Sequence, residues 1–170
     1  GSDLIAPSFL VQTSPAYDDS VVPDQYDPER AKEYLAKSNY DPNRPIKLTG
    51  MTSTLKAEET LLATHGYLRD IGINAEINIV DYAVFNEIRG TGNYDCFFVI
   101  LHQAMFDPIG SWRQRIVTDL HHSGFVDEEL NAMITEATQI IDTDERYKLY
   151  PAIAQKTIDL AAPQFAVVQM

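Results

Sequence analysis

The fold is decided by the stretch Tyr94-Asp95-Cys96-Phe97-Phe98-Val99-Ile100-Leu101, which continues into His102-Gln103-Ala104-Met105-Phe106-Asp107-Pro108. Its first half is a run of aromatic and β-branched residues, which predicts a central strand buried on both faces of a sheet. Its second half is polar and soft, and Asp107-Pro108 ends the strand because proline has no backbone donor. In α/β proteins, ligands bind at the carboxyl ends of central strands. We therefore expect residues 102–107, named the binding segment from here on, to meet a ligand.

Strands and helices alternate on both sides of this stretch. Patterns of period two predict strands at residues 45–51 and 73–80, and a further strand is predicted at 165–168. Capping residues and apolar spacings of three and four predict helices that begin near Asp27, Lys56, Asp81, Asp127 and Asp142, the last extending to Pro163. This order is typical of an α/β fold with a mostly parallel sheet flanked by helices.

Composition and charge exclude several classes of partner. The chain has 170 residues, of which 45% are hydrophobic and 22% are charged, so it can bury a core. The net charge of −12 argues against nucleic acid and against an anionic membrane surface, since both attract lysine and arginine. The sequence has no glycine-rich phosphate loop, paired-cysteine metal site or Gly-x-Ser-x-Gly elbow, so we expect neither a cofactor nor an enzyme.

We divide the chain into three parts. Residues 1–2, Gly-Ser, are interpreted as a remnant of cloning. Residues 3–26 contain three prolines and no periodicity, which predicts an extended segment lying over a surface. Residues 27–170 are predicted to form one α/β lobe. Because the chain begins abruptly and its final strand stops in mid-course, we expect this lobe to be a fragment of a larger protein.

A pair of adjacent histidines fits more than one role. His121 and His122, near Asp119, suit metal binding or acid–base chemistry, as in a small hydrolase, but they also fit the pattern of solvated loop histidines. Adjacent residues point in different directions on regular structure, and a metal site needs a third or fourth ligand. The sequence leaves these interpretations open.

An aromatic residue with two arginines follows the binding segment. Trp112 with Arg113 and Arg115 fits an aromatic wall whose cationic partners bind a carboxylate. The same three residues fit equally a tryptophan packed beneath a loop with two solvated arginines. The sequence does not separate the two arrangements.

Several stretches of the chain carry a family resemblance. They are Tyr26-Asp27-Pro28-Glu29-Arg30-Ala31-Lys32-Glu33-Tyr34-Leu35, Leu68-Arg69-Asp70-Ile71-Gly72-Ile73-Asn74-Ala75-Glu76, Gly92-Asn93-Tyr94-Asp95, Asp107-Pro108, Gly124-Phe125 with Asp127-Glu128-Glu129-Leu130, and Asp142 with Glu145-Arg146 and Tyr150. In this order they resemble the extracytoplasmic solute-binding proteins of family 5, the peptide, dipeptide and nickel receptors of ABC importers.

The resemblance implies one lobe of a type II periplasmic-binding-protein-like fold, in which two lobes close on a ligand. This chain would be most of the C-terminal lobe, and the N-terminal lobe of the same protein would be its missing partner. The receptor would deliver its ligand to an ABC permease in the membrane, without enzymatic activity. It would work outside the cytoplasm, in the periplasm or at the outer face of the cell membrane, with or without a lipid anchor.

The resemblance also directs the choice of ligand. Peptide-binding members carry, at the position of Ala104, an aspartate that pairs with the peptide's amino group, and this chain lacks that carboxylate. We expect an oligopeptide or dipeptide ligand. The spacing from Ala104 to Pro108 is closer to the nickel receptors, which carry a histidine near the position of His121, so a nickel or metal-chelate receptor is the alternative. The expected ligand contacts are His102, Gln103, Ala104, Met105, Phe106, Asp107, Trp112 and Arg113.

Overall fold

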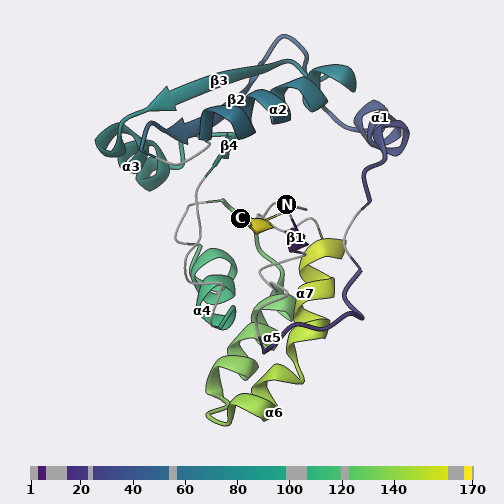
Figure 1. The fold of residues 1–170 in the computed structure, drawn as a ribbon, viewed down its shortest axis with the longest axis vertical. Helices are drawn as coiled ribbons and strands as arrows, with labels where there is room; N and C mark the ends of the chain where they lie inside the picture. The colour runs from purple at the N-terminus through teal and green to yellow at the C-terminus, as the bar shows by residue number, and fades with distance from the viewer. Residues whose placement is uncertain are drawn as a thin grey trace. The chain divides into compact units, whose positions relative to one another are not determined.

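The computed structural model describes residues 4–6, 15–22, 25–53, 57–98, 107–119, 123–160 and 167–169 (Figure 1). The chain divides into two compact units. One comprises Gly1–Asp24 together with Leu101–Met170, and we name it the helical unit. The other comprises Gln25–Ile100, and we name it the sheet unit. The prediction of a single lobe over 27–170 stays a prediction, and each unit is described by itself.

The sheet unit is built on three parallel strands, β2 (Ile46–Met51), β3 (Ala75–Val80) and β4 (Cys96–Phe97), in the order β3-β2-β4. This confirms the predicted parallel sheet flanked by helices. The expectation that the strand at 94–101 is central and buried on both faces is wrong for its described residues. The middle strand is β2, which has a partner on each side, whereas Cys96 and Phe97 of β4 are half-buried. Residues 99–101 lie outside the described part.

Helices cover both faces of this sheet. Successive side chains of a strand point to opposite faces, and Gly50 of β2 faces Ala57 and Leu61 of helix α2 (Ala57–Asp70). Phe97, in register with Thr49 and so on the other face, packs edge to face on Phe85 of helix α3 (Tyr82–Thr91), with ring centroids 5.6 Å apart. The two helices therefore sandwich the sheet.

Local signals set the ends of these helices as predicted. Asp27 caps helix α1 (Pro28–Lys37) by accepting a hydrogen bond from the Arg30 backbone N–H, and Asp81 caps α3 in the same way. Gly72, just after α2, has a φ of 94°, which favours glycine because a side chain is strained there.

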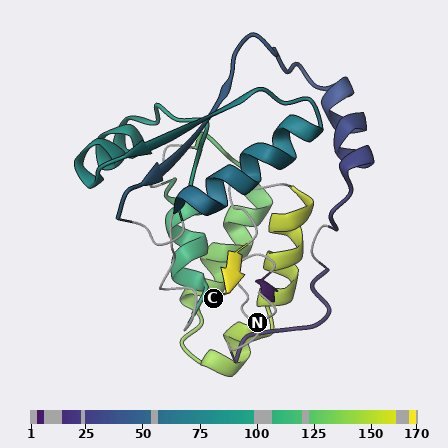
Figure 2. The same ribbon diagram turned by 45° about the horizontal axis from the view of Figure 1, so that its top comes forward.

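The helical unit contains helix α4 (Ile109–Trp112), the π-helical turn η2 (Arg113–Val117), and helices α5 (Glu128–Gln139), α6 (Thr143–Tyr147) and α7 (Tyr150–Asp159). Helices α5 and α7 lie side by side (Figures 1 and 2). Strand β1 (Leu4–Ala6) pairs antiparallel with β5 (Val167–Gln169), which confirms the predicted final strand. Among the described residues, no helix is long and apolar enough to cross a membrane.

One core holds the helical unit together. Trp112, Leu130, Ile134, Tyr150 and Ile153 have no exposed surface and pack in one cluster. The N-terminal segment adds two buried side chains, Ala16 and Val21, to the same cluster. This segment therefore contributes to a core whose other members begin at Trp112, 91 positions after Val21.

The helix predicted to run from Asp142 to Pro163 is two helices, α6 and α7. Pro151 stands in the first turn of α7. A proline ring clashes with the carbonyl four residues earlier and lacks the N–H that would bond to it. The helix must therefore break just before Tyr150, and it restarts with the proline where its missing N–H costs nothing.

We expect Gly50→Ala to lower the free energy of unfolding by about 1–3 kcal/mol, because overpacking strains a filled core. The new Cβ would lie 2.7 Å from Leu61 Cδ1, which is buried between the sheet and α2. The matched control is Gly66→Ala in α2, where the new Cβ would meet no atom within 4 Å other than those of its chain neighbours and of the helix's own backbone. It should raise the free energy of unfolding by about 0.5–1 kcal/mol through helix propensity. Urea unfolding followed by circular dichroism measures both, and equal effects would contradict the packing argument.

Candidate ligand-binding site

The structure describes three of the predicted ligand contacts, Asp107, Trp112 and Arg113, all in the helical unit. The other predicted contacts lie outside the described residues: His102, Gln103, Ala104, Met105 and Phe106. His121 and His122 lie outside them as well. The described geometry therefore begins at Asp107, the last residue of the binding segment.

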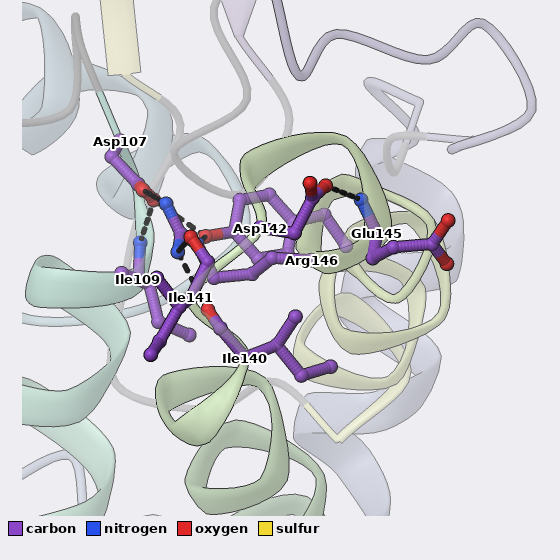
Figure 3. Close-up of polar contacts among 8 residues, drawn as sticks. Asp107, Ile109, Ile140, Ile141, Asp142, Glu145 and Arg146 are labelled. Carbon is purple, nitrogen blue, oxygen red and sulfur yellow. Dashed lines mark hydrogen bonds and ion pairs between the residues drawn. The ribbon is translucent and has the colours of Figure 1, made fainter.

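The carboxylate of Asp107 is held from three directions (Figure 3). Its Oδ1 accepts hydrogen bonds from the Ile109 backbone N–H at 3.0 Å and from the Tyr150 hydroxyl at 2.5 Å. Its Oδ2 accepts from Arg146 Nη2 at 2.7 Å, and this contact is also an ion pair. Both oxygens are thus engaged by donors of the protein itself. We name Asp107, Arg146 and Tyr150 the anchor.

Arg146 connects Asp107 to the junction between α5 and α6. Its Nη1 donates to the carbonyl of Ile140 at 2.7 Å and, at 3.4 Å, to that of Ile141 (Figure 3). Its Nε donates to the Tyr150 hydroxyl oxygen at 3.1 Å. Only the planar fork of a guanidinium can serve these acceptors together. Burial by itself lowers the pKa of Arg146, but its hydrogen bonds with Tyr150 and Asp107 raise that pKa overall, so the cation is retained.

The elements that carry the anchor are set by local sequence. Asp142 caps α6 by accepting from the Glu145 backbone N–H at 3.0 Å, and so sets the start of the short helix that bears Arg146 (Figure 3). Pro151 starts α7 at Tyr150. Pro108, fully buried, directs the chain from Asp107 into α4.

Tyr150 joins the anchor to the core. The residue has no exposed surface, and its ring packs edge to face on Trp112 with the centroids 5.1 Å apart. Burial and the Asp107 carboxylate, which accepts a hydrogen bond from the Tyr150 hydroxyl, raise the pKa of that hydroxyl well above the usual value of about 10. The described contacts of Trp112 are those of a core residue, and its predicted contact with a ligand stays a prediction.

Arg113 lies differently from Trp112. It is exposed and, together with residues of η2 and α5, lines a cavity of about 320 Å³ whose other lining residues are Val117, Thr118, Thr135, Thr138 and Gln139. The π-helical turn ends with the Thr118 N–H donating to the Arg113 carbonyl at 2.9 Å. Irregular turns of this kind are common at functional sites. A role of Arg113 toward a ligand remains a prediction.

The sheet unit has a cavity of about 420 Å³ at the amino ends of β2 and β4. Asp95, in its wall, forms an ion pair with Arg44 and accepts a hydrogen bond from the Lys47 backbone N–H at 3.0 Å. Beside it, burial and the charge of Asp95 raise the pKa of the Cys96 thiol. This cavity lies at the amino ends of the strands, whereas the binding segment follows the carboxyl end of β4 in the sequence.

The side chain of Asp119 binds Ser123 and Gly124. Its carboxylate accepts from the Ser123 backbone N–H at 2.6 Å, from Ser123 Oγ at 2.7 Å and from the Gly124 backbone N–H at 2.9 Å. These bonds give Asp119, at a φ of 43°, a local structural role. The part of the chain that the structure describes contains no cluster of histidine, cysteine and acidic residues able to hold a metal ion.

Sequence reasoning missed the partners of Asp107. It found Asp107-Pro108 and the Asp142, Glu145-Arg146 and Tyr150 set as separate stretches, but it had no reason to join them. A signal was present, since a lone carboxylate after an apolar strand needs a cation or several donors when it is partly buried. That rule names the kind of partner, but it does not say which arginine.

Solved structures of several bacterial proteins have the same fold. The chain is similar to the ABC transporter substrate binding protein CtaP from Listeria monocytogenes, with 17% identity, a TM-score of 0.81 and coverage of 98% of this chain and 35% of that one. It is similar to the dipeptide binding protein from Pseudoalteromonas sp. SM9913 in complex with Met-Leu, with 20% identity, a TM-score of 0.76 and coverage of 98% of this chain and 34% of that one. It is also similar to NikA from Brucella suis in complex with Fe(III)-EDTA, with 17% identity, a TM-score of 0.77 and coverage of 99% of this chain and 37% of that one. The chain thus spans about a third of the length of these proteins.

The fold is therefore that of a periplasmic-binding-protein-like α/β protein, as the sequence predicted. The family model of the bacterial extracellular solute-binding proteins, family 5 Middle, matches residues 1–114. The chain belongs to this family. No curated protein sequence matches it.

We expect Tyr150→Phe to lower the free energy of unfolding of the helical unit by about 1–2 kcal/mol near pH 7, because Asp107 loses a donor. The variant should also be less sensitive to alkali. In the unfolded chain Tyr150 loses its proton above about pH 10, whereas the folded chain retains it to higher pH, so the stability of the parent chain falls as the pH rises above 10. Urea unfolding followed by the fluorescence of Trp112, the one tryptophan in the sequence, measures this.

The matched control for this prediction is Tyr82→Phe, which removes an exposed hydroxyl in the sheet unit. That variant should keep the alkaline loss of stability of the parent chain. If Tyr150→Phe shows the same loss between pH 9 and 11 as Tyr82→Phe does, Tyr150 is not the titrating group.

Proposed function

We propose that this chain forms most of the C-terminal lobe of a receptor that binds an oligopeptide or dipeptide outside the cytoplasm and delivers it to an ABC permease. Membership in the solute-binding family, from a match over residues 1–114, carries this proposal. Receptors of this class bind and release their ligand without chemistry, so we propose no enzymatic role. The N-terminal lobe of the same protein would complete the cleft.

In this proposal, the binding segment supplies one wall of the cleft. His102, Gln103, Met105 and Phe106 would contact the ligand, while the anchor at Asp107 holds the end of the segment. Closure of the two lobes excludes water and is stabilised by ligand contacts with both of them. Because both oxygens of Asp107 are engaged, we propose that Asp107 supports the wall rather than pairing with a cationic ligand.

Ala104 is the residue that most affects the choice of ligand. A receptor without a carboxylate at this position must bind the amino end of a peptide through other groups or bind it less strongly. A nickel or metal-chelate receptor is the alternative within the family. Relatives of the same fold include a protein solved with the dipeptide Met-Leu and one solved with Fe(III)-EDTA, so the fold accommodates either class.

Mass spectrometry of small molecules that co-purify with the complete receptor tests the ligand class. We expect peptides, and a nickel chelate found in their place would overturn the peptide assignment. Isothermal titration with the identified peptide tests the two-lobe arrangement. The 170-residue chain should bind at least about a hundredfold more weakly than the complete receptor, because it lacks one set of contacts. Equal affinities would contradict the requirement for a second lobe.

Ala104→Asp should introduce a preference for peptides with a free amino end. In a water-excluded cleft a carboxylate pairs strongly with an ammonium group. N-acetylation of the peptide should therefore reduce the affinity of the variant by about tenfold more than it reduces that of the parent receptor. Ala104→Asn introduces a side chain of the same size as that of aspartate but without its charge, and this variant should show no such preference. Equal effects of acetylation on all three proteins would place Ala104 away from the amino end of the ligand.

A further inference from the structure

The cavity between η2 and α5 is formed by the helical unit alone, and all of its lining residues are described. Its volume of about 320 Å³ is at the lower end of the range for small-molecule sites. The lining residues are Arg113, Val117 and Thr118 from η2 and its end, and Thr135, Thr138 and Gln139 from α5. None of them is acidic, although the chain has a net charge of −12. The cavity therefore keeps the positive charge of Arg113 without a carboxylate in its lining.

Arg113 is the charged group of this cavity. It is exposed, and among the described residues its side chain forms no ion pair and no hydrogen bond. By contrast, Arg146, Lys148 and Lys156 of the same unit each pair with a carboxylate. An arginine presents its N–H donors in a planar fork that fits a carboxylate through parallel hydrogen bonds. With respect to the described residues, the fork of Arg113 is therefore available to a ligand.

The threonines of the cavity supply hydrogen-bond acceptors and not donors. Each hydroxyl donates to the backbone carbonyl four residues earlier: Thr118 to Gln114 at 3.0 Å, Thr135 to Asn131 at 2.7 Å and Thr138 to Ile134 at 2.7 Å. A hydroxyl has a single proton to donate but keeps lone pairs on its oxygen. These oxygens can therefore accept a hydrogen bond from a ligand N–H, whereas they have no proton left for a ligand carboxylate. Val117 and the threonine methyl groups add apolar groups to the lining.

We infer that this cavity binds an N-acylated amino acid, the group that also forms the carboxyl end of every peptide. The carboxylate of the ligand pairs with Arg113, its amide N–H donates to a threonine oxygen, and its side chain lies against Val117. The two kinds of lining group fix the direction of the ligand, because only Arg113 suits the carboxylate and only the threonine oxygens suit the N–H. The inference uses neither the binding segment nor a second lobe, so its failure would leave the proposed receptor function untouched.

Proton–nitrogen NMR of the isotope-labelled 170-residue chain tests the ligand chemistry, with acetyl-alanine as the probe. The backbone amide signals of the residues that line the cavity should shift together and give one dissociation constant, and those of the sheet unit should not move. Acetyl-alaninamide, which lacks the carboxylate, should bind at least about tenfold more weakly. Shifts spread over both units, or equal binding of the acid and the amide, would overturn the inference.

Substitution of Arg113 tests the cation. Arg113→Gln changes an exposed side chain, so the variant should fold, and it should bind acetyl-alanine about tenfold more weakly. Arg113→Lys keeps the charge without the fork and should lie between this variant and the parent chain. The matched control is Lys148→Gln, which removes an exposed cation of the same unit that pairs with Glu145 at 2.7 Å, and it should bind like the parent chain.

A purely structural role of Arg113 predicts a different result. Thr138 and Gln139 lie in the last turn of α5, and a cation near the carboxyl end of a helix stabilises that helix. Arg113→Gln would then lower the free energy of unfolding but bind acetyl-alanine as the parent chain does. That outcome would overturn the inference.

Two further probes test the threonine oxygens and the source of the ligand. O-acetyl-lactate has the shape of acetyl-alanine with an ester oxygen in place of the N–H, so it should bind about fivefold more weakly. Equal binding of the ester would overturn the part assigned to the threonines. Acetyl-trialanine separates the two sources of the same group. Binding at least as tight as that of acetyl-alanine would support the end of a peptide, and loss of binding would support a single N-acylated amino acid.

Discussion

The carboxylate of Asp107 carries a charge to a place where its side chain is only 28% exposed, and the helical unit is arranged around that constraint. A charge taken from water must be paired and hydrogen-bonded, or it costs several kcal/mol. The carboxylate accepts hydrogen bonds from three donors: the Ile109 N–H of α4, the Arg146 side chain of α6 and the Tyr150 hydroxyl of α7. Because Tyr150 also packs on Trp112, the polar anchor and the apolar core share one residue. The start of α4, the turn of α6 and the break before α7 therefore depend on one another.

The sheet unit is held by a different principle. Its buried cluster is formed by Leu48, Leu61 and Ala75. The face of β2 that carries Leu48 and Gly50 packs closely on α2 because glycine has no side chain to hold the helix away. Its described ion pairs, Lys32 with Glu29, Arg44 with Asp95 and Arg69 with Asp70, each include an exposed partner, and the Arg44 side chain is 77% exposed. Pairs this exposed contribute little to stability. Packing and backbone hydrogen bonds therefore do most of the stabilising in the sheet unit.

Local patterns predicted the elements well because caps and periodicity act over a few residues. Asp27, Asp81, Asp127 and Asp142 each cap the helix expected to follow them. The expectation of a central strand at 94–101 is wrong for its described residues, because an apolar run does not say how many partners a strand has. The expectation of a single helix from Asp142 is wrong, because the apolar spacing continues across Pro151 although proline has no N–H to donate to the carbonyl four residues earlier.

By itself, the sequence determined the α/β class, the parallel sheet and the family, because alternation, caps and motif order are properties of neighbours along the chain. It also predicted that Asp107-Pro108 ends the apolar stretch that begins at Tyr94. Only the tertiary structure decided which residues meet Asp107 and that Trp112 is buried against Tyr150. Those contacts join residues 38 to 43 positions apart, and no periodic pattern specifies such pairs. The partly buried charge of Asp107 requires a partner, and the positions of α6 and α7 bring Arg146 and Tyr150 into contact with it.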